Sequence, residues 1–527
     1  MVRTIVDDRL LCRLPECSDC AIAPEFVSVH YDCYTIYLHE SKLEPNEALS
    51  RLWVVGLWRS PWPRAPLIHL SRNNLPINQE ALIRVAEIYG IPWLSRFPPE
   101  IIHIIRQLSL HELLWRSISV IHLAAQLSIP SEPLSKIPLD SILSWERGAE
   151  LIRTSSSSHP PWVRLTISPD GISKVERLAK RPQYNGTQTE CLAFIVEQDL
   201  ADVDAEFKDG LLRLCLPRPQ RTLQIWNTPA PPDPTTCLFR PMRHVTWQRL
   251  HAIELDRICG ITFFFVGGEL YGIYVHHSPD SCAVEVYKRF PNRRRLRAVW
   301  CYLPIARKDR VVVLGTRTTE FGLNVLVRTR LSGDVIIGCL GQRSDLDRLL
   351  GKDQITFIYG EPDELQPVLV FGASCPTPVE KSGFPRPFSL QDFQPTPPRA
   401  YFSWAPLKDV LSTHTFYDKD TGLCRGIILY YENGGSRAVG QCRLHVDDSI
   451  LVARPSRLCF QATTYLTRIR KQERHGVRVE FGAGGDDPHG HGGGEGWECR
   501  PLRGVLELTF TEDASYLAVA EDAQKYD

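Results

Sequence analysis

Residues 260–275 read Gly-Ile-Thr-Phe-Phe-Phe-Val-Gly-Gly-Glu-Leu-Tyr-Gly-Ile-Tyr-Val. Two runs of β-branched and aromatic residues flank Gly267 and Gly268, which is the pattern of two strands joined by a tight turn. Similar short runs recur after residue 160 between glycines, aspartates and prolines. Because strands and long helices do not alternate there, the sequence predicts mostly antiparallel sheets rather than a doubly wound parallel sheet.

A stretch further along the chain resembles this hairpin. Residues 424–440 also contain Gly-Ile, an apolar and aromatic run, a Gly-Gly turn and a second run. Two interpretations remain open: a duplicated β module, or two ordinary hairpins that share the chemistry of a glycine turn.

Residues 98–127 have the three- and four-residue apolar spacing of helices. Residues 1 to about 40 are short of this spacing, and residues 29–37 alternate like a strand. Asn78 is expected to cap a helix that ends at Gly90, and two further helices are expected within residues 98–127. The serine run at 155–158 is typical of a linker, so the first domain boundary is expected there.

These patterns predict an α+β, multidomain chain, in which a small helical part precedes a β-rich, mostly antiparallel region of two β modules. A segment with seven prolines is expected to be extended and to connect the modules. The expected divisions are a cysteine-rich segment at 1–40, a helical domain at 41–154, a first β module at 160–375, the proline-rich connector at 376–398, and a second β module at 399–520 with a glycine- and histidine-rich loop at 482–496.

The composition disfavours several classes of function. Among 527 residues, 61 are basic and 61 are acidic, so no overall positive field favours nucleic acid or an anionic membrane. No apolar run approaches the roughly 18 to 20 residues of a membrane span. Acidic residues stand near the N-terminus, where a secretory signal needs a basic start and an apolar core. We therefore expect an intracellular chain of the cytoplasm or nucleus, with no membrane or nucleic-acid partner.

Four of the sixteen cysteines fall within the first 33 residues: Cys12, Cys17, Cys20 and Cys33. Together with His30 they give Cys-x4-Cys-x2-Cys and His-x2-Cys spacings, and zinc is held by four such ligands when a turn brings two pairs together. The sequence therefore predicts a structural zinc site among these five residues. A cluster of buried, reduced thiols and a redox role remain the alternatives. The twelve other cysteines are interpreted as small, reduced, buried side chains.

A second local pattern lies near residue 100. Residues 97–108 read Phe-Pro-Pro-Glu-Ile-Ile-His-Ile-Ile-Arg-Gln-Leu, and residues 110–115 read Leu-His-Glu-Leu-Leu-Trp. The prolines suit the start of a helix, where no amide partner is needed, and Glu100 in the first turn complements the helix dipole. The apolar face of this helix pair is expected to bind a partner helix. Its candidate residues are Pro98, Pro99, Ile101, Ile102, Ile105, Leu108, Leu113 and Leu114.

This pattern, within about residues 94–127, resembles the F-box. The resemblance implies that the partner is the adaptor subunit of a cullin-RING ubiquitin ligase. The stretch departs from the F-box where Val120-Ile-His-Leu-Ala replaces the usual Val-Cys-Lys/Arg-x-Trp ending, and the proline before the second helix is missing. A packed helical hairpin without a partner remains the alternative. The whole layout is also similar to that of a large group of fungal proteins, a resemblance that implies no activity.

The remaining motifs add no catalytic signature. Residues 288–297 carry six cations and are interpreted as a solvated loop, while the Gly-Gly-Asp-Asp-Pro-His-Gly-His run at 484–491 is interpreted as a flexible segment. No metalloprotease, nucleophile-elbow or phosphate-loop pattern occurs. We expect a non-enzymatic interaction protein, an F-box-like substrate receptor whose β-rich region binds a protein or a glycan. The alternative is an enzyme with its site in a cleft between the β modules.

Overall fold

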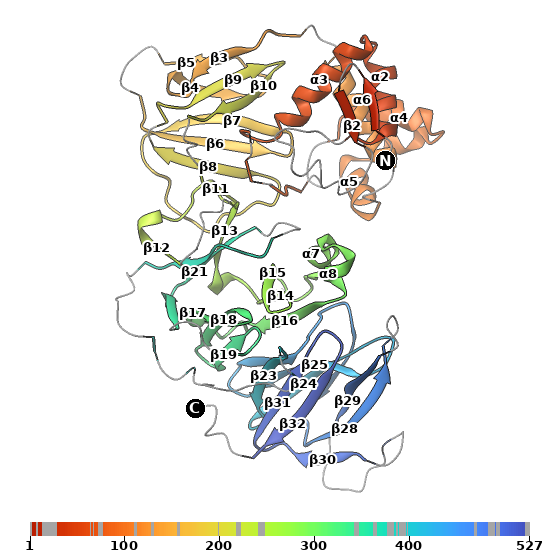
Figure 1. Cartoon of the computed structure of the whole chain (residues 1–527), viewed down its shortest axis with the longest axis vertical. Helices are drawn as coiled ribbons and strands as arrows, with labels where there is room; N and C mark the ends of the chain where they lie inside the picture. Colours follow the sequence, from red (N-terminus) through yellow and green to blue (C-terminus); the bar gives the residue numbers. More distant parts are fainter. Residues whose placement is uncertain are drawn as a thin grey trace. The chain divides into compact units, whose positions relative to one another are not determined.

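The computed structural model has helices mainly near the N-terminus and mostly antiparallel sheets beyond them, which confirms the predicted α+β class (Figure 1). No helix in the part of the chain described is long and apolar enough to cross a membrane. Only the backbone is described for residues 3–6 and 9–12. The structure describes residues 3–6, 9–12, 29–63, 65–66, 68–71, 77–109, 113–127, 131–154, 159–198, 200–217, 223–240, 248–341, 347–361, 366–376, 384–385, 388, 397, 399–467, 472–482, 491 and 496–521.

The chain forms two compact units. The first contains Met1–Pro231 together with Trp247–Leu250, and the second contains Pro232–Thr246 together with His251–Asp527. This division does not coincide with the linker predicted at 155–158, because the strands that follow this linker belong to the same unit as the helices. Most of the predicted connector at 376–398 lies outside the described residues.

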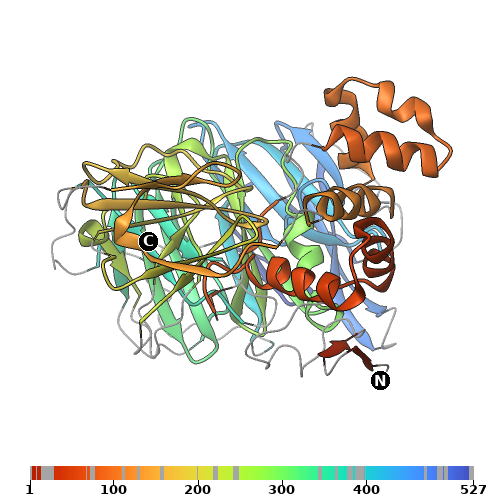
Figure 2. The same ribbon diagram turned by 90° about the horizontal axis from the view of Figure 1, so that it is seen from above.

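The helices of the first unit form between residues 31 and 127 and lie together at one side of that unit's strands (Figures 1 and 2). The predicted cap is confirmed, since the Asn78 side chain accepts a hydrogen bond from the Ala81 amide at 2.8 Å, and Gly90 follows the helix with a positive φ of 69°. The helices are α2 Tyr31–Ser41, α3 Pro45–Leu57, α4 Gln79–Ile88, the 3₁₀ helix η1 Pro92–Arg96, α5 Pro99–Leu108 and α6 Leu113–Leu127.

Helix α2 corrects an interpretation of the cysteine-rich segment. The alternation of residues 29–37 resembles a strand, but Tyr31–Ser41 is helical. The helix stabilises the fold by burying Tyr37 against Leu52 and Leu127, which come from α3 and α6. Tertiary packing therefore overrides the local alternation here.

The first unit begins with a two-stranded sheet of β1 Arg3–Val6 and β2 Arg9–Cys12. Its other strands pair in the orders β10-β9-β3 and β11-β8-β6-β7-β4-β5 and surround one core. The core contains side chains of both of these groups, such as Leu212 from the former and Leu165 from the latter. After the helices, strands begin again at Ser135, so the helical part is shorter than the predicted 41–154. The strands are β3 Ser135–Pro138, β4 Ile142–Glu146, β5 Ile152–Arg153, β6 Trp162–Ser168, β7 Gly171–Leu178, β8 Ala193–Gln198, β9 Asp204–Lys208, β10 Leu211–Cys215 and β11 Ile225–Trp226.

The short segment Trp247–Leu250 returns to this first unit through a buried arginine. The guanidinium of Arg249 donates hydrogen bonds to the carbonyl oxygens of His69, Thr189 and Leu192 at 3.2, 3.1 and 2.9 Å. Charge-assisted bonds of this kind are roughly twice as strong as neutral ones. The segment therefore contacts two parts of the first unit that are far apart in the sequence, around His69 and at Thr189–Leu192.

The strands of the second unit pair in groups of three or four neighbours. Their orders are β12-β22-β21-β13, β15-β14-β16, β19-β18-β17-β20, β23-β31-β32, β26-β25-β24-β27 and β29-β28-β30. The elements are β12 Cys237–Phe239, β13 Leu250–Glu254, β14 Gly260–Val266, β15 Glu269–His276, α7 Val284–Arg289, α8 Asn292–Arg295, β16 Ala298–Pro304, β17 Val311–Thr319, β18 Gly322–Thr329, β19 Gly333–Ile337, β20 Arg348–Lys352, β21 Thr356–Gly360, β22 Phe371–Ser374, β23 Tyr401–Pro406, β24 Val410–Tyr417, β25 Cys424–Tyr431, β26 Ser436–Gly440, β27 Asp448–Ala453, β28 Arg457–Leu466, β29 Glu473–Gly482, β30 Glu498–Pro501, β31 Val505–Phe510 and β32 Ser515–Ala520.

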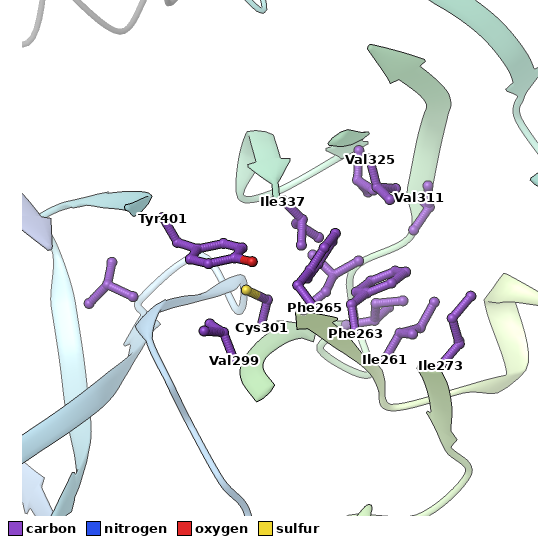
Figure 3. Close-up of a cluster of buried hydrophobic side chains, with 14 of the residues drawn as sticks. Ile261, Phe263, Phe265, Ile273, Val299, Cys301, Val311, Val325, Ile337 and Tyr401 are labelled. Atoms are coloured by element: carbon purple, nitrogen blue, oxygen red, sulfur yellow. The ribbon is translucent and has the colours of Figure 1, made fainter. Parts of the chain in front are cut away.

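The predicted hairpin at 260–275 lies at the centre of the second unit. Strands β14 and β15 pair antiparallel around Gly267 and Gly268. Successive side chains point to opposite faces, so Phe263 and Phe265 enter the largest apolar core, while Phe264 enters a second cluster. Figure 3 shows Phe263 and Phe265 together in that core. Its members run from Ile253 to Phe510, so both predicted β modules share one core.

The turn of this hairpin meets a second turn at close range. Gly268 has a φ of 97°, and a Cβ atom there would lie 2.1 Å from the Phe321 carbonyl oxygen. A Cβ at Gly322, in the turn between β17 and β18, would lie 2.5 Å from the Gly268 carbonyl oxygen. Two glycines thus allow the two turns to touch through their backbones.

The basic stretch at 288–297 was expected to be a solvated loop, but most of it is helical. Residues Val284–Arg289 and Asn292–Arg295 form the short helices α7 and α8. Phe290, between them, is buried against Phe264 and Trp300. An apolar anchor therefore orders the segment, while its arginines remain at the surface.

Candidate functional site

The helix pair that resembles an F-box is present in the structure. Helix α5 begins after Pro98 with Pro99 as its first residue, and Glu100 lies in its first turn, as predicted. One serine joins the two helices: the Trp115 indole of α6 donates to the Ser109 hydroxyl at 2.9 Å, and that hydroxyl donates to the Ile105 carbonyl at 2.6 Å. The angle between the helices therefore depends on a specific bond as well as on packing.

Some of the predicted partner-binding residues hold the helices together instead. Ile102 is only 2% exposed and lies in the core with Trp115 and Ile118. Ile105 and Leu114 are half-buried and pack against the same core. Ile102 is therefore not accessible to a partner in this structure, which corrects its assignment to the binding face.

Other residues of the pair form an open apolar face. Ile101, Ile104 and Leu108 are 40%, 50% and 85% exposed. Because they are spaced three and four residues apart, they share one side of α5. Leu113, at the start of α6, is 42% exposed. We call these four residues the open face; Ile104 was not among the sequence candidates, because the F-box pattern emphasises its neighbours.

The predicted N-terminal zinc ligands are not brought together within the described residues. Cys17 and Cys20 lie outside those residues, and only the backbone of Cys12 is described, at the end of strand β2 Arg9–Cys12. His30 stands at the N-cap position of α2, where its side chain makes no capping hydrogen bond, and Cys33 lies in the first turn of that helix. Burial raises the pKa of the Cys33 thiol, although nearby Arg116 opposes this effect.

A different group of metal-ligating side chains does converge, in the second unit. The Cys459, His491 and Cys499 side chains each offer one ligand atom, and these atoms lie within 4.8 Å of one another. Cys459 belongs to the central strand β28 and is paired in register with Cys499 of β30 (Figure 1). We call these three residues the Cys2His cluster; it could hold a metal ion.

The imidazole of this cluster is held on three sides. His491 Nε2 lies 3.2 Å from Cys499 Sγ, and His491 Nδ1 lies 2.9 Å from Glu480 Oε2. The ring also stacks on Trp497, with centroids 4.3 Å apart and planes inclined by 11°. Glu480 in turn is paired in register with Cys459 on the other side of β28. The side chains of Cys459, Glu480, Trp497 and Cys499 therefore surround the His491 imidazole.

The two thiols of the cluster differ in their surroundings. Cys459 is buried and Cys499 is exposed. Burial raises the pKa of Cys459 to about 12, and Cys499 and the Glu480 charge add to this effect. Without a cation this thiol keeps its proton at neutral pH. A bound metal ion would reverse that preference, because a coordinating thiol is deprotonated.

The Cys2His cluster has no recognisable spacing in the sequence. Its ligands are separated by 31 and 7 residues, whereas zinc-binding pairs are usually recognised by two to four intervening residues. The late cysteines were interpreted as buried hydrophobes and the segment containing His491 as flexible. One available signal was His491 eight residues before Cys499, in a region where strand β28 also carries a cysteine.

The second unit also contains a charged cleft of about 1230 Å³. Arg293, Arg294 and Arg297, in and after helix α8, line it together with four carboxylates. Arg294 lies over the Tyr271 ring, 4.3 Å from its centroid. The carboxylates are those of Asp418, Asp420, Glu512 and Asp513.

The described contacts of this cleft favour charge recognition over proton transfer. Asp418 accepts hydrogen bonds from the Arg425 guanidinium and from Thr421. Burial alone would raise the Asp418 pKa, but Arg425 and Thr421 outweigh burial and hold it below its usual value. Asp513 accepts a bond from Arg474 at 2.9 Å. An acid–base pair needs one carboxyl whose pKa is raised, so Asp418 does not suit the role of a general acid.

No protein-family model matches the chain, and a search of curated proteins finds no match. The site must therefore be interpreted from its own chemistry.

Proposed function

We propose that this chain is a non-enzymatic interaction protein that binds a partner helix through the open face of α5 and α6. The exposure of Ile101, Ile104 and Leu108 on one side of α5 carries this proposal. Burying one such side chain in an interface is worth about 1.5 to 3 kcal/mol. The resemblance of the stretch to the F-box supports the adaptor subunit of a cullin-RING ubiquitin ligase as the partner.

The β-rich part would then recognise a second partner, either a protein or a glycan. The charged cleft supports this role, because arginines, carboxylates, Tyr271 and Tyr465 line it. Such a set offers donors, acceptors and aromatic surface to one polar ligand. In this proposal the helix pair connects the chain to the ligase, while the cleft selects what is brought to it.

The first prediction concerns the open face. Leu108→Asp should abolish co-purification of the adaptor when both proteins are overexpressed, because a carboxylate cannot be buried cheaply in an apolar interface. The free energy of unfolding should change by less than about 1 kcal/mol, since the site is exposed. Pull-down and chemical denaturation of the same preparation measure the two effects.

Two further variants make the result specific. Leu134→Asp, at another exposed leucine of the same unit, should leave adaptor binding unchanged. Ile102→Ala should lower the free energy of unfolding by about 2 to 5 kcal/mol, because it opens a cavity in the core of the helices. Wild-type protein that never retains the adaptor, or Leu108→Asp protein that retains it fully, would contradict the proposal.

Zinc at Cys12, Cys17, Cys20, His30 and Cys33 also stays a prediction. The position of His30 and Cys33 three residues apart at the start of α2 supports one ligand pair, because such residues share a helix face. A Cys17→Ser, Cys20→Ser double variant should then lose one zinc ion per chain relative to the wild type. Unchanged zinc content would leave the buried-thiol alternative.

A further inference from the structure

We propose that the Cys2His cluster of Cys459, His491 and Cys499 binds a zinc ion that fastens His491 to the sheet β29-β28-β30. This site is separate from the open face of α5, and the proposal does not depend on adaptor binding.

The register of the sheet supplies the first argument. Residues directly opposite each other on neighbouring strands project their side chains on the same face of the sheet. Cys459 is opposite Cys499 on one side and opposite Glu480 on the other. Two thiols and a carboxylate are therefore placed side by side by backbone pairing alone, before any ion binds.

The distances within the cluster supply the second argument. Zinc binds sulfur at about 2.3 Å and nitrogen at about 2.0–2.1 Å, so two such ligands of one tetrahedral ion lie about 3.5 Å apart. His491 Nε2 lies 3.2 Å from Cys499 Sγ, and the ligand atoms of all three residues lie within 4.8 Å. Small side-chain rotations would bring the three atoms to one ion.

The orientation of the imidazole supplies the third argument. Glu480 accepts a hydrogen bond at His491 Nδ1, so this nitrogen carries the proton. The other nitrogen, Nε2, then presents its lone pair toward Cys499. A carboxylate that fixes the tautomer of a histidine ligand is a regular companion of zinc sites. The stack on Trp497 restricts the ring further.

The ligand types favour zinc over the common hard cations. Two cysteines and one histidine suit zinc, whereas calcium and magnesium require oxygen ligands. Three protein ligands leave a tetrahedral ion one position for water or another donor. Cys499 is exposed, so an ion can enter from solvent.

Two other states of the cluster are the competing outcomes. Cys459 and Cys499 face each other across strands and could form a disulfide, or the thiols could remain reduced without an ion. These states differ from the zinc site in metal content and in the role of His491, because neither needs an imidazole.

The experiment uses the full chain purified under reducing conditions without chelator. Metal analysis of the wild type should show one zinc ion per chain more than analysis of Cys499→Ser or His491→Ala. Cys237→Ser, which changes another partly exposed cysteine on a strand of the same unit, should keep the wild-type content. Glu480→Gln should weaken zinc binding about 10- to 100-fold, as for other carboxylates that support a ligand.

Cobalt replacement gives a second readout that does not depend on total zinc. Cobalt-loaded wild type should show the tetrahedral visible bands and the thiolate charge-transfer band, and Cys499→Ser should lose part of the latter. Equal metal content in wild type, Cys499→Ser and His491→Ala would overturn the proposal. A disulfide between Cys459 and Cys499 in the protein as purified under these reducing conditions, with no zinc bound, would overturn it as well.

Discussion

His276 shows how one buried side chain makes the stability of the fold depend on pH. Its imidazole is enclosed, with Nε2 2.8 Å from the Thr262 hydroxyl and Nδ1 3.1 Å from the Ser281 carbonyl oxygen. The carbonyl can only accept, so Nδ1 carries the proton and Nε2 accepts from Thr262. Burial is the main reason that the His276 pKa falls to about 4; the Ser281 carbonyl opposes it, and the charges of His445 and His277 add to it.

We predict that this histidine destabilises the fold in acid. Between pH 6.5 and 4 the unfolded chain binds a proton at His276 that the folded chain does not, so stability falls as pH falls through that window. The loss reaches roughly 3 kcal/mol below pH 4, from a shift of about 2.5 pKa units. Chemical denaturation at pH 7 and pH 4.5 measures how much the free energy of unfolding falls between these pH values. That fall should be smaller in His276→Gln than in the wild type. Equal pH dependence in the variant and the wild type would contradict this account.

At the scale of elements, the two hairpins with glycine turns can be compared directly. Gly268 and Gly434 both have positive φ, 97° and 88°. A Cβ at Gly268 would meet the Phe321 carbonyl oxygen at 2.1 Å, whereas the nearest atom at Gly434 is in the Lys308 side chain at 3.4 Å. A Gly-Gly turn therefore occurs both where another backbone lies in close contact, at Gly268, and where only a flexible side chain is near, at Gly434.

We predict that Gly268→Ala destabilises the chain more than Gly434→Ala. Each substitution forces a rare backbone conformation, which costs about 1 to 3 kcal/mol, but only the first also pushes two turns apart. Denaturation midpoints of the two variants give the comparison, and equal losses would show that the close approach of the turns adds nothing.

Elements whose local pattern agrees with their packing could be predicted from the sequence. The side chains of the hairpin at 260–275 point alternately into two apolar clusters. The start of α5 is set by Pro99 and Glu100. Helices α2 and α7 were missed, because buried aromatic residues stabilise them through contacts with distant segments. The Cys2His cluster was missed for a related reason: Cys459 and Cys499 meet only through strand register, which the sequence does not show.

At the scale of the molecule, the return of Trp247–Leu250 to the first unit makes Arg249 a long-range connection. We predict that Arg249→Met lowers the free energy of unfolding by about 3 to 5 kcal/mol, since it leaves three carbonyl groups without their charged donor. Arg257→Met removes an exposed arginine paired with Glu254 and should cost less than about 1 kcal/mol. Denaturation of both variants tests this, and similar losses would show that the connection is not important.

The same segment constrains how the protein can be made and rearranged. During synthesis the first unit cannot close around Arg249 until the ribosome has released residue 250, by which time Pro232–Thr246 of the other unit has already emerged. Until then the carbonyl groups of His69 and Thr189 lack the charged donor that they have in the folded chain. A gene that ends at residue 231 would encode a first unit without the buried Arg249 side chain. The two units therefore cannot be exchanged separately between proteins by a single cut at this point. Recombination between homologous genes should avoid this stretch.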